Sequence, residues 1–148
     1  MFLRHQPENP LWSASSIRAL SDKNDNSFRT ATNLGTIKPG RSFSFRTRGF
    51  VGAGDRADYF QFKVLPGVEL RDSLRITADG NGANLSVFIK VGNGRIQKDG
   101  DTLTINPVFP LSGQGTLFNS TGVRATYYLR LTPFDGDSTY RIAYSGTL

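Results

Sequence analysis

The chain of 148 residues contains no cysteine and a single histidine, His5. The missing thiols exclude disulfide bonds, thiolate nucleophiles and cysteine-based zinc sites. Because the one imidazole lies at the N-terminus, no histidine is available in the rest of the chain as a catalytic base or a metal ligand. A pair of carboxylates is then the remaining route to acid–base catalysis. This composition disfavours an enzyme, and we expect a protein without catalytic residues.

Long hydrophobic runs are also missing. No apolar stretch approaches the roughly 18 residues that a membrane-spanning helix needs, so we expect no transmembrane segment. The first ten residues lack the apolar core of a secretory signal. We therefore expect a cytoplasmic protein if Met1 is the native start, and a secreted or periplasmic one if a signal sequence precedes it.

The net charge of +6 is concentrated in the first third of the sequence. Residues 1–50 hold eight Lys or Arg and three acidic residues, a net charge of +5, whereas residues 51–148 hold ten and nine, a net charge of +1. The densest basic stretch contains no acidic residue, and its cations are Lys38, Arg41, Arg46 and Arg48. Such a cluster favours an acidic partner surface, a polyanion or anionic lipid. The alternative is a solvated strand face that aids solubility.

Nucleic acid is a weaker candidate partner than protein. Arg46 and Arg48 share a strand face near Phe50, but residues 51–148 are almost neutral. That strand also carries no pair of exposed aromatic side chains on which bases would stack. We therefore predict acidic protein surfaces as the partners of the basic stretch.

Residues 1–30 differ in composition from the rest and are predicted to form an N-terminal extended arm. The segment is rich in Ser and Asn and carries Pro7 and Pro10. Ser13 is a suitable cap for a short helix over residues 14–20. The arm is expected to anchor a partner chain through its apolar side chains or to pack on its own domain, and the candidate anchors are Trp12, Ile17 and Leu20.

From residue 31 onward the sequence alternates between apolar and polar residues with the period of half-buried strands. The stretch Tyr59–Val64 is typical, and similar stretches recur about every 10–15 residues, separated by turns rich in Gly and Asp. Pro107 and Pro110 limit their region to an edge strand or a loop. We expect an all-β fold, a jelly-roll-like antiparallel β-sandwich of seven to nine strands over residues 31–148.

Two aromatic residues fall on the polar side of their predicted strands. Tyr127 and Tyr128 are adjacent and must point to opposite faces, and Phe88 alternates with apolar neighbours. An outward-facing aromatic pair is either a contact patch for carbohydrate or protein, or it is covered by a loop or by the arm.

The acidic residues Asp55 and Asp58 precede an aromatic strand and are the best candidates for a metal site. Their short side chains suit a tight turn, so a structural role is favoured over calcium binding and over catalysis. Asp135 and Asp137 flank Gly136 in a second turn, to which the same interpretation applies. We expect no cofactor, with calcium as the one candidate ion.

Four segments in order resemble the bacterial pre-peptidase C-terminal (PPC) domain family. They are Ala31–Ile37 (ATNLGTI), Gly49–Phe62 with its DRADYFQF end, Asn84–Ile89 with the Gly92-Asn-Gly94 turn, and Thr126–Leu131 with Gly136–Tyr140. The resemblance covers about residues 30–147 and implies a non-catalytic β-sandwich. Asn84 stands where the family has Asp, and Ala125 where it has Gly. Some members of that family bind calcium, so the resemblance implies a calcium site here as well. Asn84 weakens this expectation, because an amide replaces a charged carboxylate ligand.

Two functional hypotheses follow. The first is a non-catalytic interaction or assembly module, a basic linker or accessory subunit that docks on acidic protein partners in a larger complex, such as a light-harvesting antenna. The second is a secreted or surface PPC-type domain that binds polysaccharide, fibrous protein or calcium as an accessory to an enzyme.

Overall fold

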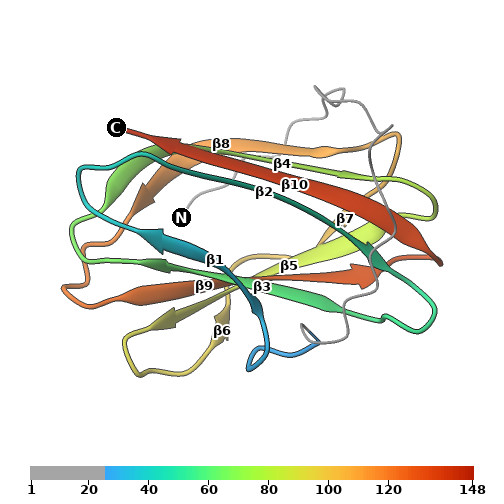
Figure 1. Cartoon of the computed structure of the whole chain (residues 1–148), viewed down its shortest axis with the longest axis horizontal. Coiled ribbons are helices and arrows are strands. Elements are labelled where there is room, and N and C mark those ends of the chain that lie inside the picture. The colour runs from blue at the N-terminus through green and yellow to red at the C-terminus, as the bar shows by residue number, and fades with distance from the viewer. Residues whose placement is uncertain (1–25) are drawn as a thin grey trace.

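The protein, described here from a computed structural model over residues 26–148, is an all-β sandwich of two sheets (Figure 1). The predicted helix over residues 14–20 and the candidate anchors Trp12, Ile17 and Leu20 lie outside the described residues. Ten strands follow one another along the chain: β1 (Thr32–Ile37), β2 (Phe43–Val51), β3 (Asp58–Val64), β4 (Glu69–Ala78), β5 (Ala83–Val91), β6 (Gln97–Lys98), β7 (Leu103–Ile105), β8 (Leu111–Phe118), β9 (Ala125–Pro133) and β10 (Ser138–Thr147).

The strands form two layers, and most successive strands alternate between them. Sheet A has the order β1-β3-β9-β5-β6 with β7 also paired to β5, and sheet B has the order β2-β10-β4-β8. The predicted sandwich class is confirmed. The strand count exceeds the predicted seven to nine because β6 and β7 are only two and three residues long. The short β7 agrees with the limit that the prolines after it impose.

One strand pair departs from the predicted antiparallel arrangement. β1 and β3 pair in parallel, whereas every other named pair is antiparallel. The reason is that β2 lies between them in the chain but belongs to the opposite sheet. The chain therefore crosses the sandwich twice and returns to sheet A in its original direction.

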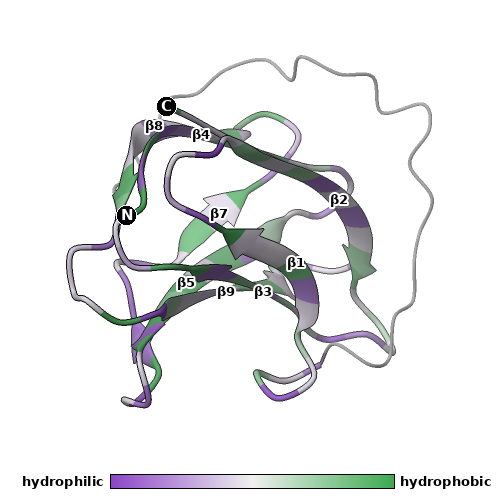
Figure 2. Cartoon of the chain, turned by 60° about the vertical axis from the view of Figure 1, so that its left-hand side comes forward, coloured by the Kyte–Doolittle hydropathy of each residue, from purple (hydrophilic) through white to green (hydrophobic). Residues whose placement is uncertain are grey.

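The interior is filled by the inward row of each strand, as the period of two requires. Figure 2 shows the two layers with hydrophobic and hydrophilic residues alternating along the strands. Aromatic rings from both sheets meet at the centre. Phe62 stacks on Tyr127 of its own sheet at 5.4 Å and on Tyr144 of the opposite sheet at 5.8 Å, measured between ring centroids. Tyr144 also stacks on Phe45, at 5.4 Å. The two sheets are thus joined by a continuous set of ring contacts.

A second aromatic cluster lies on the outer face of sheet A and is covered by the segment that precedes β1. The ring of Phe28 contacts Tyr59 and Phe88 edge-on at 4.9 Å and Tyr128 at 5.2 Å. Tyr128 is consequently only 7% exposed. The guanidinium of Arg130 also lies over the ring of Phe88, 4.9 Å from its centroid. Of the two sequence-based alternatives for these outward aromatics, the structure favours cover by the chain itself over an open contact patch.

Replacing Phe28 by Ala should destabilise the sandwich, because the three rings beneath it become exposed. We expect a loss of about 1 to 3 kcal/mol in the free energy of unfolding, measured by chemical denaturation. Phe134→Ala is the matched control, since this phenylalanine is 56% exposed, and it should change stability by less than about 0.5 kcal/mol. Equal losses in the two variants would contradict the anchoring role of Phe28.

Candidate functional site

The connections between strands gather at the two ends of the sandwich, and the two ends carry opposite charge. Strand register places the β1–β2, β3–β4, β5–β6 and β8–β9 connections at one end and the β2–β3, β4–β5, β7–β8 and β9–β10 connections at the other. We call the first the basic end, because its connections hold four cations and no carboxylate side chain: Lys38, Arg41, Arg95 and Arg124. We call the second the acidic end, with one cation, Arg56, and four carboxylates: Asp55, Asp79, Asp135 and Asp137.

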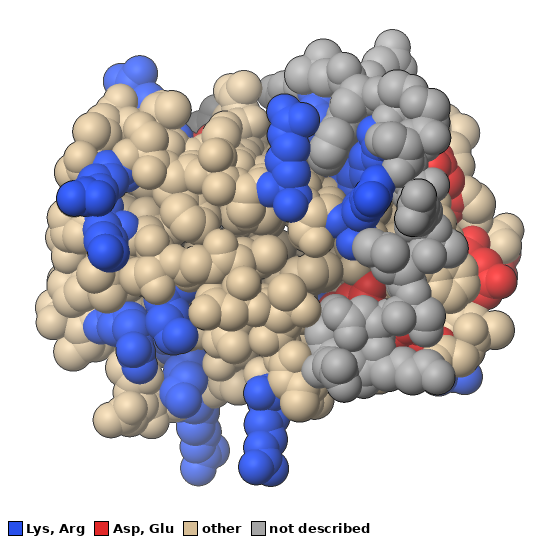
Figure 3. Space-filling model, in the orientation of Figure 1, with Lys and Arg blue, Asp and Glu red and all other residues tan. Residues whose placement is uncertain are grey.

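The basic end is formed by residues that are distant in sequence. Lys38, Arg41, Arg95 and Arg124 are all exposed. Glu69, the first residue of β4, is an exposed carboxylate that borders this end. On the face seen in Figure 3, acidic atoms gather on the right, where β2–β3 and β9–β10 turn, and basic atoms lie over the left, lower and upper central parts. This separation gives the molecule a charge gradient along its strands.

The predicted basic stretch is divided between two surfaces. Lys38 and Arg41 lie at the basic end, whereas Arg46 and Arg48 are on the outer face of sheet B, in the edge strand β2. In the strand register Arg48 lies opposite Arg141 of the neighbouring strand β10. Arg46 and Arg75 of β4 lie in the same row across the sheet, with β10 between them. These four arginines all have interaction partners. The stretch is therefore not one binding patch, although each half belongs to a larger basic surface.

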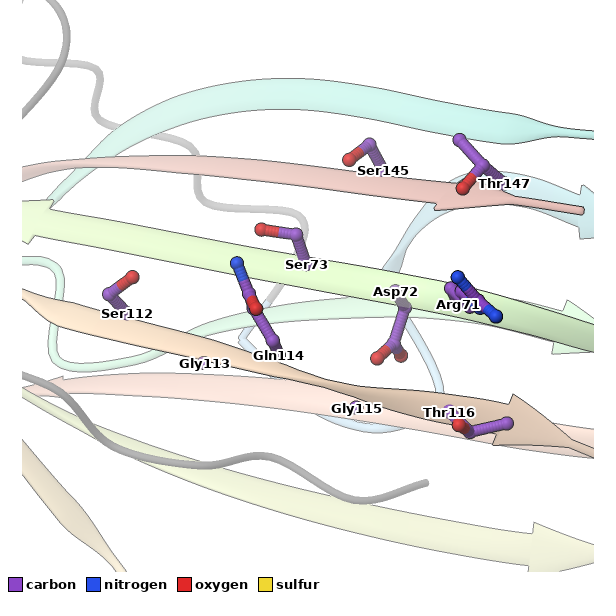
Figure 4. A pocket seen from close by; sticks show the side chains of 10 residues that line it. All are labelled: Arg71, Asp72, Ser73, Ser112, Gly113, Gln114, Gly115, Thr116, Ser145 and Thr147. Carbon is purple, nitrogen blue, oxygen red and sulfur yellow. The ribbon is translucent and has the colours of Figure 1, made fainter.

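A polar groove runs along the outer face of sheet B over β10, β4 and β8. Its volume is about 590 Å³, and Figure 4 shows its lining side chains on the three strands. Most of the lining is hydroxyl or amide: Ser73, Ser112, Gln114, Thr116, Ser145 and Thr147. Arg71 supplies the one cation. The lining also includes Gly113 and Gly115 of β8, which carry no side chain.

Asp72 lies beneath this groove, on the opposite side of β4 from Ser73 (Figure 4). Its carboxylate is 4% exposed and accepts a hydrogen bond of 2.9 Å from the Tyr144 hydroxyl. Its second oxygen has no hydrogen-bond partner. Burial raises the pKa of Asp72 above the ordinary value of 3.8, against the lowering effect of the Tyr144 hydrogen bond. Asp72 was not among the predicted site residues, although its place in the alternation Leu70, Asp72, Leu74 puts it on the inner row.

The two tyrosines near Asp72 are held in the neutral form. Burial, followed by the charges of Asp99 and Asp72, raises the pKa of Tyr127 to about 12. Burial and Asp72 also raise the pKa of Tyr144. At neutral pH Tyr144 therefore keeps its proton and donates the hydrogen bond to Asp72. Asp72 and these tyrosines form a structural network in the interior.

The candidate calcium ligands Asp55 and Asp58 are both buried, at 2% exposed each. The backbone of Asp55 closes a short bridge with Gly52, through bonds of 2.7 and 3.1 Å. One oxygen of Asp58 accepts a hydrogen bond from the Tyr140 hydroxyl, at a point where Gly49 has no Cβ to block it. Among residues 26–148, no group of three acidic or histidine side chains is placed to hold a metal ion. Asp55 and Asp58 therefore both make structural contacts next to β3.

The second acidic turn also has a structural role. Asp137 accepts a hydrogen bond of 2.9 Å from the amide of Ala53, which ties the β9–β10 turn to the β2–β3 connection. No described segment is a helix long and apolar enough to span a membrane.

Comparison with known proteins gives a likeness of fold. No protein-family model matches the chain, and no curated protein matches it. A similar solved structure is the pre-peptidase C-terminal domain of the collagenase from Bacillus anthracis, with 16% sequence identity and a TM-score of 0.49. The alignment covers 77% of this chain and 93% of that domain. This solved structure belongs to the family that the sequence motifs resemble, and the likeness carries no information about ligand or partner.

Replacing Asp72 by Asn should stabilise the protein at neutral pH. The raised pKa means that the folded protein favours the protonated carboxyl, so its contribution is most favourable below pH 3.8 and is lost as the pH rises through the folded pKa. Asn removes the buried charge and still accepts the Tyr144 hydrogen bond. We expect the melting temperature of Asp72→Asn to exceed that of the wild type by a few degrees at pH 7.

The difference between Asp72→Asn and the wild type should shrink as the pH falls below about 4, because Asp72 is then protonated in both states. Tyr144→Phe is the contrasting variant. It leaves the carboxylate without this donor and should cost about 1 to 3 kcal/mol. A constant difference between Asp72→Asn and wild type across the acid range would show that the charge of Asp72 is not the cause.

Proposed function

We propose that this protein is a non-catalytic interaction module that docks on acidic protein partners through its basic end. The observation that carries the proposal is the separation of charge between the two sets of connections. The basic end presents four exposed cations without a carboxylate side chain among them. Such a surface attracts an acidic partner from a distance and orients it before contact.

The β-sandwich supports this role because it holds the four cations on short connections between its strands. The connections lie between strands whose inward rows form one core, so the cations are presented on a rigid frame. The chemistry of the chain also supports a non-catalytic role. It has no cysteine, its single histidine is His5, and its buried Asp58 and Asp72 are bound by tyrosine hydroxyls. A large acidic assembly such as a light-harvesting antenna is one candidate partner.

Reversing the charge of the basic end should abolish retention of acidic partners. The variant Lys38→Glu/Arg41→Glu/Arg95→Glu/Arg124→Glu and the wild type are compared as immobilised baits in native lysate, with bound proteins quantified by mass spectrometry. We expect proteins of low isoelectric point on the wild type, released by added salt because exposed charges are screened. The quadruple variant should lose them.

The control reverses the opposite end. Asp79→Lys/Asp135→Lys changes charge at the acidic end and should retain the same partners as the wild type. Partners that remain on the quadruple variant would refute docking through the basic end. Arg46→Glu/Arg48→Glu tests the outer face of sheet B separately, since these two side chains lie away from the basic end.

A second candidate function is polysaccharide binding in the groove of sheet B. The groove is favoured for this role by its row of hydroxyl and amide groups on β10, β4 and β8, which suits the hydroxyls of a sugar chain, and by Arg71, which suits an acidic sugar. For calcium, the other ligand that a PPC-type domain would bind, no group of three acidic side chains is placed to hold the ion among the described residues.

Titration with acidic and neutral oligosaccharides by calorimetry tests the groove. If sugars bind there, Arg71→Ala should lower the affinity for the acidic oligosaccharide by roughly tenfold, because one charge-assisted hydrogen bond is lost. The affinity for the neutral oligosaccharide should stay nearly unchanged. Arg95→Ala, at the basic end, is the matched control. Equal binding of acidic sugars by the wild type and Arg71→Ala would exclude the groove as their site.

A further inference from the structure

The exposed hydrophobic side chains of the sandwich are confined to its two ends. Among residues 26–148, the large hydrophobic residues that are exposed are Val91, Ile96, Val108, Phe109, Phe118, Val123, Phe134 and Leu148. Each of them lies in a connection, at the last residue of a strand or after β10, and none lies within the outer face of a sheet. Exposed apolar side chains that gather in one place mark interaction surfaces. The two ends, which also carry opposite charge, are therefore where we expect contacts with other molecules.

At the acidic end, three of these side chains lie around the start of β5. Strand register places β9 and β7 on the two sides of Ala83, the first residue of β5. Phe134 directly follows β9, and the connection that follows β7 carries Val108 and Phe109. The amide of Phe134 donates a hydrogen bond of 3.1 Å to the carbonyl of Gly82, which holds this residue beside the start of β5. We call Val108, Phe109 and Phe134 the acidic-end cluster.

The β7–β8 connection is held in shape by Asn106. Its side-chain oxygen accepts hydrogen bonds from the amides of Val108 and Phe109, at 2.9 and 2.8 Å. Its own amide donates a hydrogen bond of 3.3 Å to the carbonyl of Phe109. Val108 and Phe109 are nevertheless 73% and 57% exposed. An ordered turn thus presents two apolar side chains to water, where they contribute nothing to the core.

Three carboxylates border the acidic-end cluster. Asp135 and Asp137 belong to the same turn as its Phe134, and Asp79 belongs to the β4–β5 turn. The two turns are joined by a hydrogen bond of 3.0 Å from the amide of Asn81 to the carbonyl of Asp137. Arg56, the one cation of this end, belongs to the β2–β3 connection. The acidic end therefore combines an apolar cluster with a negative border.

The basic end carries a second apolar cluster, around the last residue of β5. This residue, Val91, lies opposite the start of β9. Val123 lies in the connection before β9, and Ile96 directly precedes β6 on the other side of β5. A backbone hydrogen bond of 2.7 Å joins the β5–β6 and β8–β9 connections, and the cations Arg95 and Arg124 are next in sequence to Ile96 and Val123. We call Val91, Ile96 and Val123 the basic-end cluster, which has a positive border.

We propose that copies of this chain associate head to tail, with the acidic-end cluster of one copy against the basic-end cluster of the next. The inference rests on the proposed function, because it uses the same basic end and names the acidic end of a second copy as its partner. The two clusters lie at the opposite ends of β5, so stacking copies along this strand brings them together. Apolar side chains then leave water, and the carboxylates around one cluster face the cations around the other.

Charge complementarity favours a second copy as the occupant of each end. Every molecule that has one of these surfaces also has the complementary surface at its other end. Contacts between two basic ends or two acidic ends would instead place like charges opposite each other. A contact between two different surfaces leaves a free end on each side of a pair, so association continues into chains or a ring. We therefore expect a series of oligomers instead of a closed dimer.

Sedimentation velocity over a wide concentration range tests this association. The wild type should form oligomers beyond the dimer, and added salt should weaken them by screening the charges. The acidic-end variant Phe109→Ser/Phe134→Ser and the basic-end variant Ile96→Ser/Val123→Ser should each weaken self-association on the order of tenfold or more, because apolar contact is lost. All four side chains are exposed, so both variants should keep the melting temperature of the dilute wild type.

Mixing the two variants distinguishes a head-to-tail contact from other arrangements. Each variant retains the cluster that the other has lost, so an equimolar mixture should form 1:1 complexes that do not grow further. Leu148→Ser is the matched control, because it removes an exposed apolar side chain that belongs to neither cluster. This variant should associate like the wild type.

A wild type that stays monomeric at every concentration would overturn the inference. Cluster variants that associate like the wild type, or a mixture without 1:1 complexes, would also overturn it. The proposed function fails by a different result. A monomeric wild type that still retains acidic lysate proteins through its basic end keeps that function and loses only the head-to-tail contact, whereas retention of those proteins by the quadruple charge-reversal variant would refute docking through the basic end itself.

Discussion

The burial of one residue row from each sheet in a shared apolar interior is the constraint on which the rest of this structure depends. Aromatic rings make the central contacts: Phe62 of sheet A meets Tyr144 of sheet B, and Tyr127 and Phe45 extend the stack to each side. Rings bury a large area per residue with few rotatable bonds, so a few of them hold two sheets in register. Strands can then differ freely on their outer faces without loss of the fold.

The separation between a buried core and variable outer surfaces explains where the candidate functional surfaces lie. Because successive strands mostly alternate between the two sheets, nearly every connection is brought to one end of the sandwich or the other. Residues as distant in sequence as Lys38 and Arg124 come to the same end of the sandwich through topology alone. The charges of the connections then set the potential of each end, independently of the core. Opposite charges at the two ends arise from eight short segments, none of which is unusual by itself.

The strands were readily predicted from the sequence, because alternation is a local property. Tyr59–Val64 was predicted as a strand and lies within β3. The parallel pairing of β1 and β3 was not predicted, since it depends on β2 crossing to the other sheet. The dense basic stretch of the sequence includes Lys38 and Arg41. It does not include Arg95 and Arg124, which come to the same basic end only in the folded protein. Asp72 was missed because a charged residue on the inner row interrupts the apolar alternation that predicts a strand, although it lies between Leu70 and Leu74 within β4.

The buried carboxylate of Asp72 is accommodated by the composition of β8. Asp72 lies directly across from Gly115, and Leu74 across from Gly113. Larger inward side chains at these two glycines would compete for space with Asp72 and Leu74, which are 4% and 1% exposed. Gly113 is itself buried. The two glycines are therefore explained by the space that the inward side chains of β4 need, so the buried carboxylate belongs to the packing of sheet B.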